Sequence, residues 1–293
     1  MIKRFYPTEL IIIAYLLMTG LLILLKYPHL EFTGSHFFLR LIVFIVIIFL
    51  ASIRNRNHLY KTRQFVRIFF PLILLAYLYK ETDYLNNLIF PENLDIFFSR
   101  IEEGLFATQP SYWFAQICNS NIFAELMYFG YFSYYLLLAG IPLYFYFKRE
   151  TKTAEQLVFM LSNSFLIYYI LFIILPVAGP QFYFTDWVII PGGYLFGPIM
   201  KTIQANGEAP TAAFPSSHVS ICLMVLMFCY KYSRKLLMVI IPIATLLILS
   251  TVYIRAHYVI DVIAAIALTP LIYYISLTFY SILNQFINRQ QTE

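Results

Sequence analysis

The sequence predicts an all-α integral membrane protein, a polytopic bundle of about eight transmembrane helices. Of its 293 residues, 61% are hydrophobic and only 12% are charged, and the mean hydropathy is +0.73. This composition leaves too little polar surface to cover a soluble globule. The apolar runs are continuous rather than alternating, which favours membrane helices over a transmembrane β-barrel.

The apolar runs define the expected spans, since a helix needs about 20 residues to cross a bilayer. The third run is short and contains Pro71, although proline is tolerated within membrane helices. No small-x-small cleavage site follows Leu25, so we expect the first run to remain as a span. The runs lie near residues 8–25, 37–53, 66–79, 122–147, 155–175, 215–230, 236–254 and 258–280.

The basic residues divide unequally between the two sides of the predicted bundle. If successive loops alternate sides, 14 of the 20 Lys and Arg residues fall on the side of both termini and 6 on the other. By the positive-inside rule, the richer side is cytoplasmic. The net charge of +5 therefore reflects topology, and we expect no nucleic-acid partner. The richer side holds Lys3, Arg4, Arg54, Arg56, Lys61, Arg63, Arg67, Lys148, Arg149, Lys152, Lys231, Arg234, Lys235 and Arg289, and the other side holds Lys26, Arg40, Lys80, Arg100, Lys201 and Arg255.

Two longer segments interrupt the alternation of spans and short turns, and both fall on the non-cytoplasmic side. Residues 80–121 are acidic and then aromatic, as expected of an amphipathic helix at the membrane interface. Residues 176–214 are rich in Gly, Pro and aromatic residues, which is typical of a lid or binding loop. We expect N-terminal spans with an interfacial segment over 1–110, a catalytic membrane domain over 111–285 and a cytoplasmic tail over 286–293.

Two polar motifs begin apolar helices on the predicted non-cytoplasmic face. The first is Pro215-Ser216-Ser217-His218, and the second is His257-Tyr258-Val259-Ile260-Asp261. The chain crosses the membrane twice between them, so both histidines fall on one face. Ionisable groups at membrane depth are costly and indicate a functional site.

The residue types in these motifs predict chemistry on phosphate. His257 and Asp261 are four residues apart and share a helix face, so Asp261 can fix the imidazole tautomer and stabilise the imidazolium that forms on attack. The helix N-terminus at Ser216 and Ser217 predicts an anion site that suits phosphate. His218 is placed to protonate a leaving alkoxide.

Other interpretations of the two motifs remain open. A His-x-x-x-Asp pair is often a structural hydrogen bond, and Pro-Ser-Ser-His is often only a helix start. A proton- or anion-coupled transporter with His218, His257 and Asp261 on its path is a second class of function. No internal repeat of the kind common in transporters is apparent.

The remaining cysteines and histidines predict no metal site. The cysteines are too few and too scattered for a disulfide framework or metal ligands. We expect the other histidines to be solvated or interfacial loop residues. These residues are Cys118, Cys222 and Cys229, and His29, His36 and His58.

Pro-Ser-Ser-His and the later His-Tyr-x-x-Asp-Val resemble the second and third signature motifs of the type 2 phosphatidic acid phosphatase superfamily, integral membrane enzymes that cleave or transfer lipid phosphoesters. The resemblance covers about Ile122 to Tyr280 and implies a six-helix-type phosphatase core. It implies that His257 is the nucleophile that forms a phosphohistidine, Asp261 its orienting residue and His218 the general acid. It further implies that Ser216 and Ser217 contact phosphate, that no metal or other cofactor is needed, and that membrane lipids are the partners.

The chain departs from the superfamily pattern at the expected phosphate-binding cations. The first motif has lysine and arginine, but Leu175–Gln181 contains no basic residue, and Ser250-Thr251 stands where Ser-Arg is expected. We expect Arg255, Lys201 and Gln181 to bind phosphate instead, with an interfacial anchor as the alternative for Arg255.

These departures, together with Leu105–Trp113, resemble the inositol phosphorylceramide synthase-like branch and, more distantly, sphingomyelin synthases. This branch implies transfer of a phospho-headgroup, such as phosphoinositol, from a glycerophospholipid to a ceramide-like acceptor. A simple lipid phosphate phosphatase and a degenerate, non-catalytic homologue are the alternatives. The sequence leaves the oligomeric state open.

Overall fold

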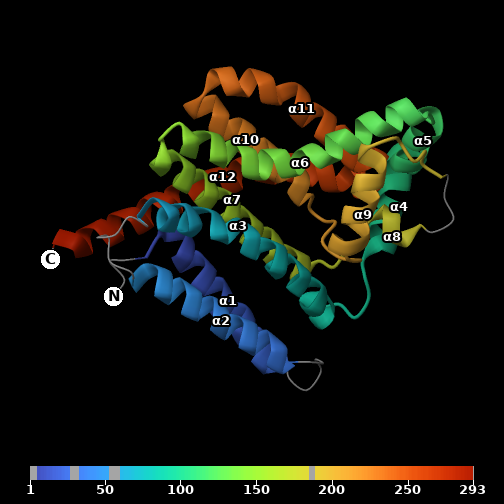
Figure 1. Ribbon diagram of the computed structural model, residues 1–293. Coiled ribbons are helices and arrows are strands. Elements are labelled where there is room, and N and C mark those ends of the chain that lie inside the picture. The colour runs from blue at the N-terminus through green and yellow to red at the C-terminus, as the bar shows by residue number, and fades with distance from the viewer. Residues whose placement is uncertain (1–4, 27–32, 53–59, 185–188, 293) are drawn as a thin grey trace.

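The computed structural model describes residues 5–26, 33–52, 60–184 and 189–292, and over these ranges its regular structure is helical without strands. The all-α class is therefore confirmed (Figure 1). The helices are α1 (Pro7–Lys26), α2 (Thr33–Ser52), α3 (Tyr60–Leu85), α4 (Asp95–Phe106), α5 (Pro110–Ile117), α6 (Asn121–Phe147), α7 (Thr151–Ile174), α8 (Pro180–Tyr183), α9 (Phe196–Gly207), α10 (Ser217–Tyr232), α11 (Arg234–Tyr253) and α12 (Val259–Thr292), with a 3-10 turn at Asn86–Leu88.

Six of the described helices, α1, α2, α6, α7, α11 and α12, are long and apolar enough to cross a membrane. They support a multi-pass integral membrane protein. The other two expected spans are helices as well, but α10 has only 16 residues and α3 carries charged residues towards both of its ends. The count of eight spans is therefore not confirmed.

Helix α7 lies at the centre of the bundle, and most of its side chains are buried. Helices α3, α6, α10, α12 and α1 pack against it, and α11 packs against α6 and α10. The contact of α6 with α11 depends on a glycine. A Cβ atom at Gly130 would lie 2.8 Å from Cγ of Leu246 and 2.9 Å from its carbonyl oxygen.

Two buried ion pairs join the first three helices. Arg67 of α3 donates to Glu9 of α1, with Nη2 and Oε2 2.6 Å apart. Arg40 of α2 donates to both carboxylate oxygens of Glu81 of α3, at 2.6 and 2.8 Å. The positive-inside prediction counts both arginines with the loop residues, although they fall within the apolar runs near 37–53 and 66–79 and lie in α2 and α3. They can be buried there because a neighbouring helix supplies the opposite charge.

His36 also lies elsewhere than the sequence predicts. It lies in α2 rather than in a loop, with Nδ1 3.0 Å from Oε1 of Glu81. Its ring stacks on Tyr84 with the centroids 4.1 Å apart. His29 and His58 lie outside the described residues.

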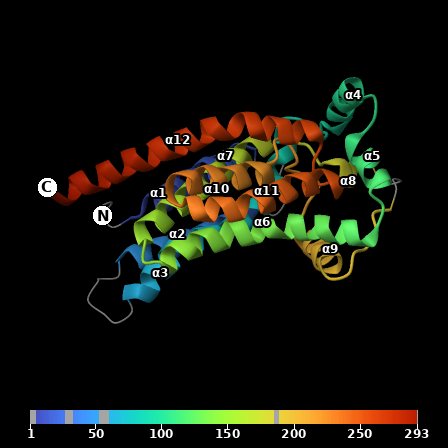
Figure 2. The same cartoon turned by 90° about the horizontal axis from the view of Figure 1, so that it is seen from above.

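The short helices gather at one end of the bundle. Figure 2 shows α4, α5, α8 and α9 at this end, and the start of α1 and the end of α12 at the other. Residues 80–121, the acidic and aromatic segment, do not form a single interfacial helix. They form the last turns of α3 and the two short helices α4 and α5. The Gly- and Pro-rich segment contributes α8 and α9, while Trp187 lies outside the described residues.

Candidate active site

The Pro-Ser-Ser-His motif caps helix α10. Ser216 is the N-cap residue, and its buried Oγ accepts from the Val219 amide at 3.3 Å. Its own amide donates to the Asp261 carbonyl at 3.2 Å, which ties the start of α10 to the first turn of α12. Pro215 precedes the cap, with a cis peptide bond to Phe214. It therefore lies outside the first helical turn, in which the motif predicts it.

Carboxylates cap the start of helix α12. Asp261 Oδ2 accepts from the Tyr258 amide at 2.8 Å, which is half of a capping box. Glu102 of α4 accepts from the amides of Val259 and Ile260, the next two donors along the chain. The first turn that follows His257 is therefore held both from within α12 and from α4.

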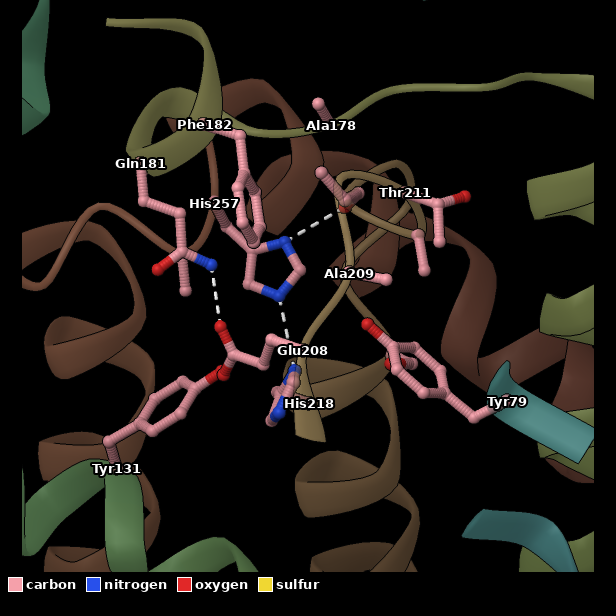
Figure 3. Close-up of a pocket in the computed structure, with 14 residues that line it drawn as sticks. Tyr79, Tyr131, Ala178, Gln181, Phe182, Glu208, Ala209, Thr211, His218 and His257 are labelled. Atoms are coloured by element: carbon pink, nitrogen blue, oxygen red, sulfur yellow. Dashed lines mark hydrogen bonds between the residues drawn. The ribbon is translucent and has the colours of Figure 1, made fainter. Parts of the chain in front are cut away.

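The two motif histidines contact each other directly. His218 Nδ1 lies 3.1 Å from His257 Nε2, and His257 Nδ1 lies 2.8 Å from the Ala213 carbonyl oxygen (Figure 3). A carbonyl only accepts, so Nδ1 of His257 carries the proton and Nε2 presents its lone pair to His218. Burial lowers the pKa of His257 to about 4. A neutral His257 is therefore the form present near neutral pH.

Asp261 lies beside His257 but is not its nearest partner. Its Oδ2 is 3.5 Å from His257 Nδ1, longer than a good hydrogen bond. The expected contact to the imidazole is made instead by the Ala213 carbonyl. Sequence spacing could not reveal this, because the carbonyl comes from the loop before α10.

Two tyrosines of α6 hold the His218 ring. Tyr131 stacks on it with the centroids 4.9 Å apart and the planes at 28°, and Tyr134 lies 4.4 Å away at 48°. Both tyrosines are buried. Their spacing of three residues places them on one helix face, but nothing in the sequence pairs that face with His218.

Glu208 lines the pocket although it belongs to neither of the two sequence motifs. It accepts from Tyr131 Oη at 2.9 Å, from Gln181 Nε2 at 2.6 Å and from Gln204 Nε2 at 3.3 Å. Figure 3 shows Glu208 beside the two histidines. The only signal in the sequence was one acidic residue near the end of a Gly- and Pro-rich segment.

Asp95 of α4 holds the loop that passes over the site. Its carboxylate accepts from the amides of Ala178 and Gly179 at 2.8 and 2.9 Å and from Tyr258 Oη at 3.1 Å. Gly179 has a φ of 96°, and a Cβ atom there would lie 2.9 Å from the Ala256 carbonyl oxygen. Glycine is therefore required where this loop passes the residue before His257.

A pocket opens beside the histidine pair. Ser217 and Gln181 line it, whereas Ser216 is occupied in capping α10. Arg255 and Lys201 do not line it. The lining residues are Tyr79, Tyr131, Ala178, Gln181, Phe182, Glu208, Ala209, Thr211, Ala212, Ala213, Ser217, His218, Ala256 and His257.

The two predicted cations are placed elsewhere. Arg255 has a φ of 68°, its carbonyl accepts from the Gln181 amide at 2.9 Å, and its guanidinium interacts electrostatically with Tyr128. Lys201 is exposed on α9 near Gly192. Over the described ranges, no three His, Cys, Asp or Glu side chains are grouped so that they could hold a metal ion. The expectation of a reaction without a cofactor remains a prediction.

The fold and the site together define a polytopic membrane protein with a paired-histidine pocket at one end of its helix bundle. A family model described as the PAP2 superfamily matches residues 98–275, from within α4 into α12. The match spans more than half of the chain, and the chain belongs to this superfamily. No curated protein and no solved structure matches the chain. Members are generally phosphatases or phosphotransferases, which supports an enzyme of that type.

Proposed function

We propose that the protein is a membrane-embedded lipid phosphotransferase or phosphatase that works through a phosphohistidine on His257. The observation that carries this proposal is the orientation of the His257 ring. Its Nδ1 proton is held by the Ala213 carbonyl at 2.8 Å, and its Nε2 lone pair points into the space shared with His218. An unprotonated nitrogen fixed in this way is suited to nucleophilic attack.

The first step forms a bond from His257 Nε2 to phosphorus while the bond from phosphorus to the leaving oxygen breaks. The electron pair leaves with that oxygen, which takes a proton from the imidazolium form of His218. Burial lowers the pKa of His218, so we propose that the negative phosphoryl group favours this charged form as it enters. Because Nε2 uses its lone pair in the new bond, the hydrogen bond between the two histidines opens as the phosphoryl group enters. The Nδ1–H bond to Ala213 and the nearby Asp261 carboxylate stabilise the positive charge that develops on His257.

The second step returns the enzyme to its starting state. An acceptor oxygen attacks phosphorus, His218 takes the acceptor proton, and the bond from phosphorus to Nε2 breaks. The tyrosine faces on His218 favour the imidazolium formed at this point. Water as acceptor gives a phosphatase, and an alcohol gives a transferase.

The start of α10 is the proposed phosphate contact. Ser217 lines the pocket at the first position of α10, where amides and a hydroxyl suit an anion. Ser216 supports this turn as its cap. The pocket lining does not support Arg255 and Lys201 as phosphate ligands, so they have no role in this mechanism.

We further propose that the acceptor is an alcohol such as a ceramide-like lipid, and that the site faces the periplasm or lumen. Gln181 and Phe182 of α8 and residues 208, 209 and 211–213 after α9 line the pocket, so an acceptor that reaches the histidines would contact them. The start of α1 and the end of α12 lie at the opposite end of the bundle (Figure 2). That arrangement is consistent with cytoplasmic termini.

Trapping the covalent intermediate tests the mechanism. Purified protein in detergent is incubated with phospholipids labelled at phosphorus, namely phosphatidic acid and phosphatidylinositol, and then quenched in alkali, which preserves phosphohistidine. Wild type should retain protein-bound label that acid removes, and His257→Gln should retain none. Label on His257→Gln equal to that on wild type would rule out this nucleophile. Addition of ceramide should move label into a new lipid if the enzyme is a transferase. Label only in water-soluble products, free phosphate from phosphatidic acid or inositol phosphate from phosphatidylinositol, would show that water is the acceptor.

A further inference from the structure

The charge of the pocket does not match a dianionic phosphate. Among its lining residues, Glu208 is an acid, and there is no Lys or Arg. The other titratable groups of the lining are two histidines and two tyrosines, Tyr79 and Tyr131. A phosphoryl group entering this pocket therefore meets a carboxylate with no Lys or Arg in the lining, and the one positive charge that the proposed mechanism places there is the His218 imidazolium.

The hydrogen bonds of Glu208 are those of an ionised carboxylate. Its three described partners, Tyr131, Gln181 and Gln204, all act as donors towards it. All three are neutral, so they fix the carboxylate in place without cancelling its charge. Gln204 also donates to Gln181 Oε1 at 3.2 Å, which joins the two amides into one network around Glu208.

The carboxylate acts electrostatically on the reacting histidine. Glu208 is among the groups that favour the charged form of His257, although burial outweighs it. The same field stabilises positive charge that develops on His257 and repels negative charge brought in by the substrate. The repulsion grows with each additional charge on the phosphoryl group.

We infer that Glu208 is a specificity-determining residue that makes this pocket select phosphodiesters over phosphomonoesters. A phosphodiester carries one negative charge, whereas a monoester carries about 1.5 to 2 near pH 7. The inference rests on the proposed function and narrows its substrate class. It places the reaction among exchanges that start from a lipid phosphodiester. His257 bonds to phosphorus and keeps the phosphoryl group with one of its two ester alcohols attached, while the bond to the other alcohol breaks and that alcohol leaves with a proton from His218.

The test compares two small ligands that differ by one ester methyl group. Binding of methyl phosphate and dimethyl phosphate to the full-length protein in detergent is measured at pH 8 by ligand-observed NMR. Wild type should bind dimethyl phosphate at least about tenfold more tightly, as expected for one extra unit charge near a carboxylate at the effective dielectric of a protein surface. Glu208→Gln should bring the two dissociation constants within about twofold, and Glu208→Asp, which keeps the charge, should preserve the preference.

Several outcomes would overturn the inference. They are equal binding of the two ligands by wild type, no binding of either, or an unchanged preference in Glu208→Gln. If Glu208→Gln does not fold, the wild-type preference alone decides. The measurement needs no turnover, so a failure of the phosphohistidine proposal in the trapping experiment remains distinguishable from a failure of this one.

Discussion

His218 Nδ1 lies 3.1 Å from His257 Nε2, although 39 residues separate them in the chain. The hairpin of α10 and α11 returns the chain to the same end of the bundle, and the Ser216 amide then joins the two helix starts through the Asp261 carbonyl. The site is therefore a property of two helix N-termini held against each other, and changes that loosen either start should affect both histidines.

The ring and the hydroxyl of Tyr131 should make separable contributions. Tyr131→Phe removes the donor to Glu208 but keeps the ring on His218, so we expect a loss of about 1 kcal/mol in the free energy of unfolding and partial retention of phosphohistidine formation. Tyr131→Ala also leaves a cavity and should lower the free energy of unfolding by about 3 to 5 kcal/mol. Denaturant unfolding in detergent and the trapping assay measure both effects. If Tyr131→Phe and Tyr131→Ala lose equal amounts of unfolding free energy and of phosphohistidine formation, the ring has no role separate from the hydroxyl.

Glu102 should make stability depend on pH. Burial raises the pKa of Glu102 to about 7 from its usual 4.5, against the lowering effect of the two α12 amides that it accepts from, and the nearby Asp261 carboxylate adds to the rise. Between these values the folded state binds more protons than the unfolded state, so this contribution to stability falls as pH rises. His257 acts in the opposite sense, because its lowered pKa makes stability rise from about pH 4 to 6.5.

Comparing wild type with Glu102→Gln separates the two effects, because His257 is present in both proteins. The thermal midpoint is measured in detergent from pH 5 to pH 8. As the pH is raised, the midpoint of wild type should fall more than that of the variant, or rise less. Parallel pH profiles would show that Glu102 does not titrate as described.

Gly130 should be sensitive to substitution, and Gly140 on the same helix should not. Gly130→Ala forces a Cβ atom against Leu246, including its backbone carbonyl, and should cost about 1 to 3 kcal/mol through separation of α6 and α11. Gly140 has open space at its Cβ position, so Gly140→Ala provides the matched control and should be neutral or slightly stabilising. Thermal unfolding measures both variants. A Gly140→Ala loss as large as that of Gly130→Ala would show that helix packing is not the cause.

The ion pair of Arg40 and Glu81 should behave as a unit. Glu81→Leu leaves a buried arginine without its carboxylate and should cost about 3 to 5 kcal/mol. The double change Arg40→Met with Glu81→Leu removes both charges and should recover most of that loss. A double variant no more stable than Glu81→Leu would contradict the pairing. Neither residue lines the histidine pocket, so the folded double variant should still form the intermediate.

The sequence predicted the class of the protein because hydropathy is a local property. Continuous apolar runs predicted eight spans. Six of them coincide with the described helices that are long and apolar enough to cross a membrane, whereas those at α3 and α10 do not. The superfamily resemblance also rested on contiguous residues, the motifs at His218 and His257, and the family match confirms it. Two crossings between the motifs were enough to predict that they share one face.

The contacts around the histidines were not predictable in this way, because their partners come from distant parts of the chain. Asp95 reaches Tyr258 across 163 residues, Glu208 reaches Tyr131 across 77, and Arg40 reaches Glu81 across 41. The sequence does not show which donors will form hydrogen bonds with a given carboxylate, or whether that carboxylate will be buried.

The sequence by itself therefore determined an all-α membrane protein with two histidine motifs on one face. Only the tertiary structure decided that the Ala213 carbonyl, rather than Asp261, makes the closest contact to His257, and that the pocket contains Glu208 in place of the expected cations. The physical reason is that helix formation and membrane insertion follow local composition, whereas the charge and hydrogen bonding of a site depend on which distant segments pack together.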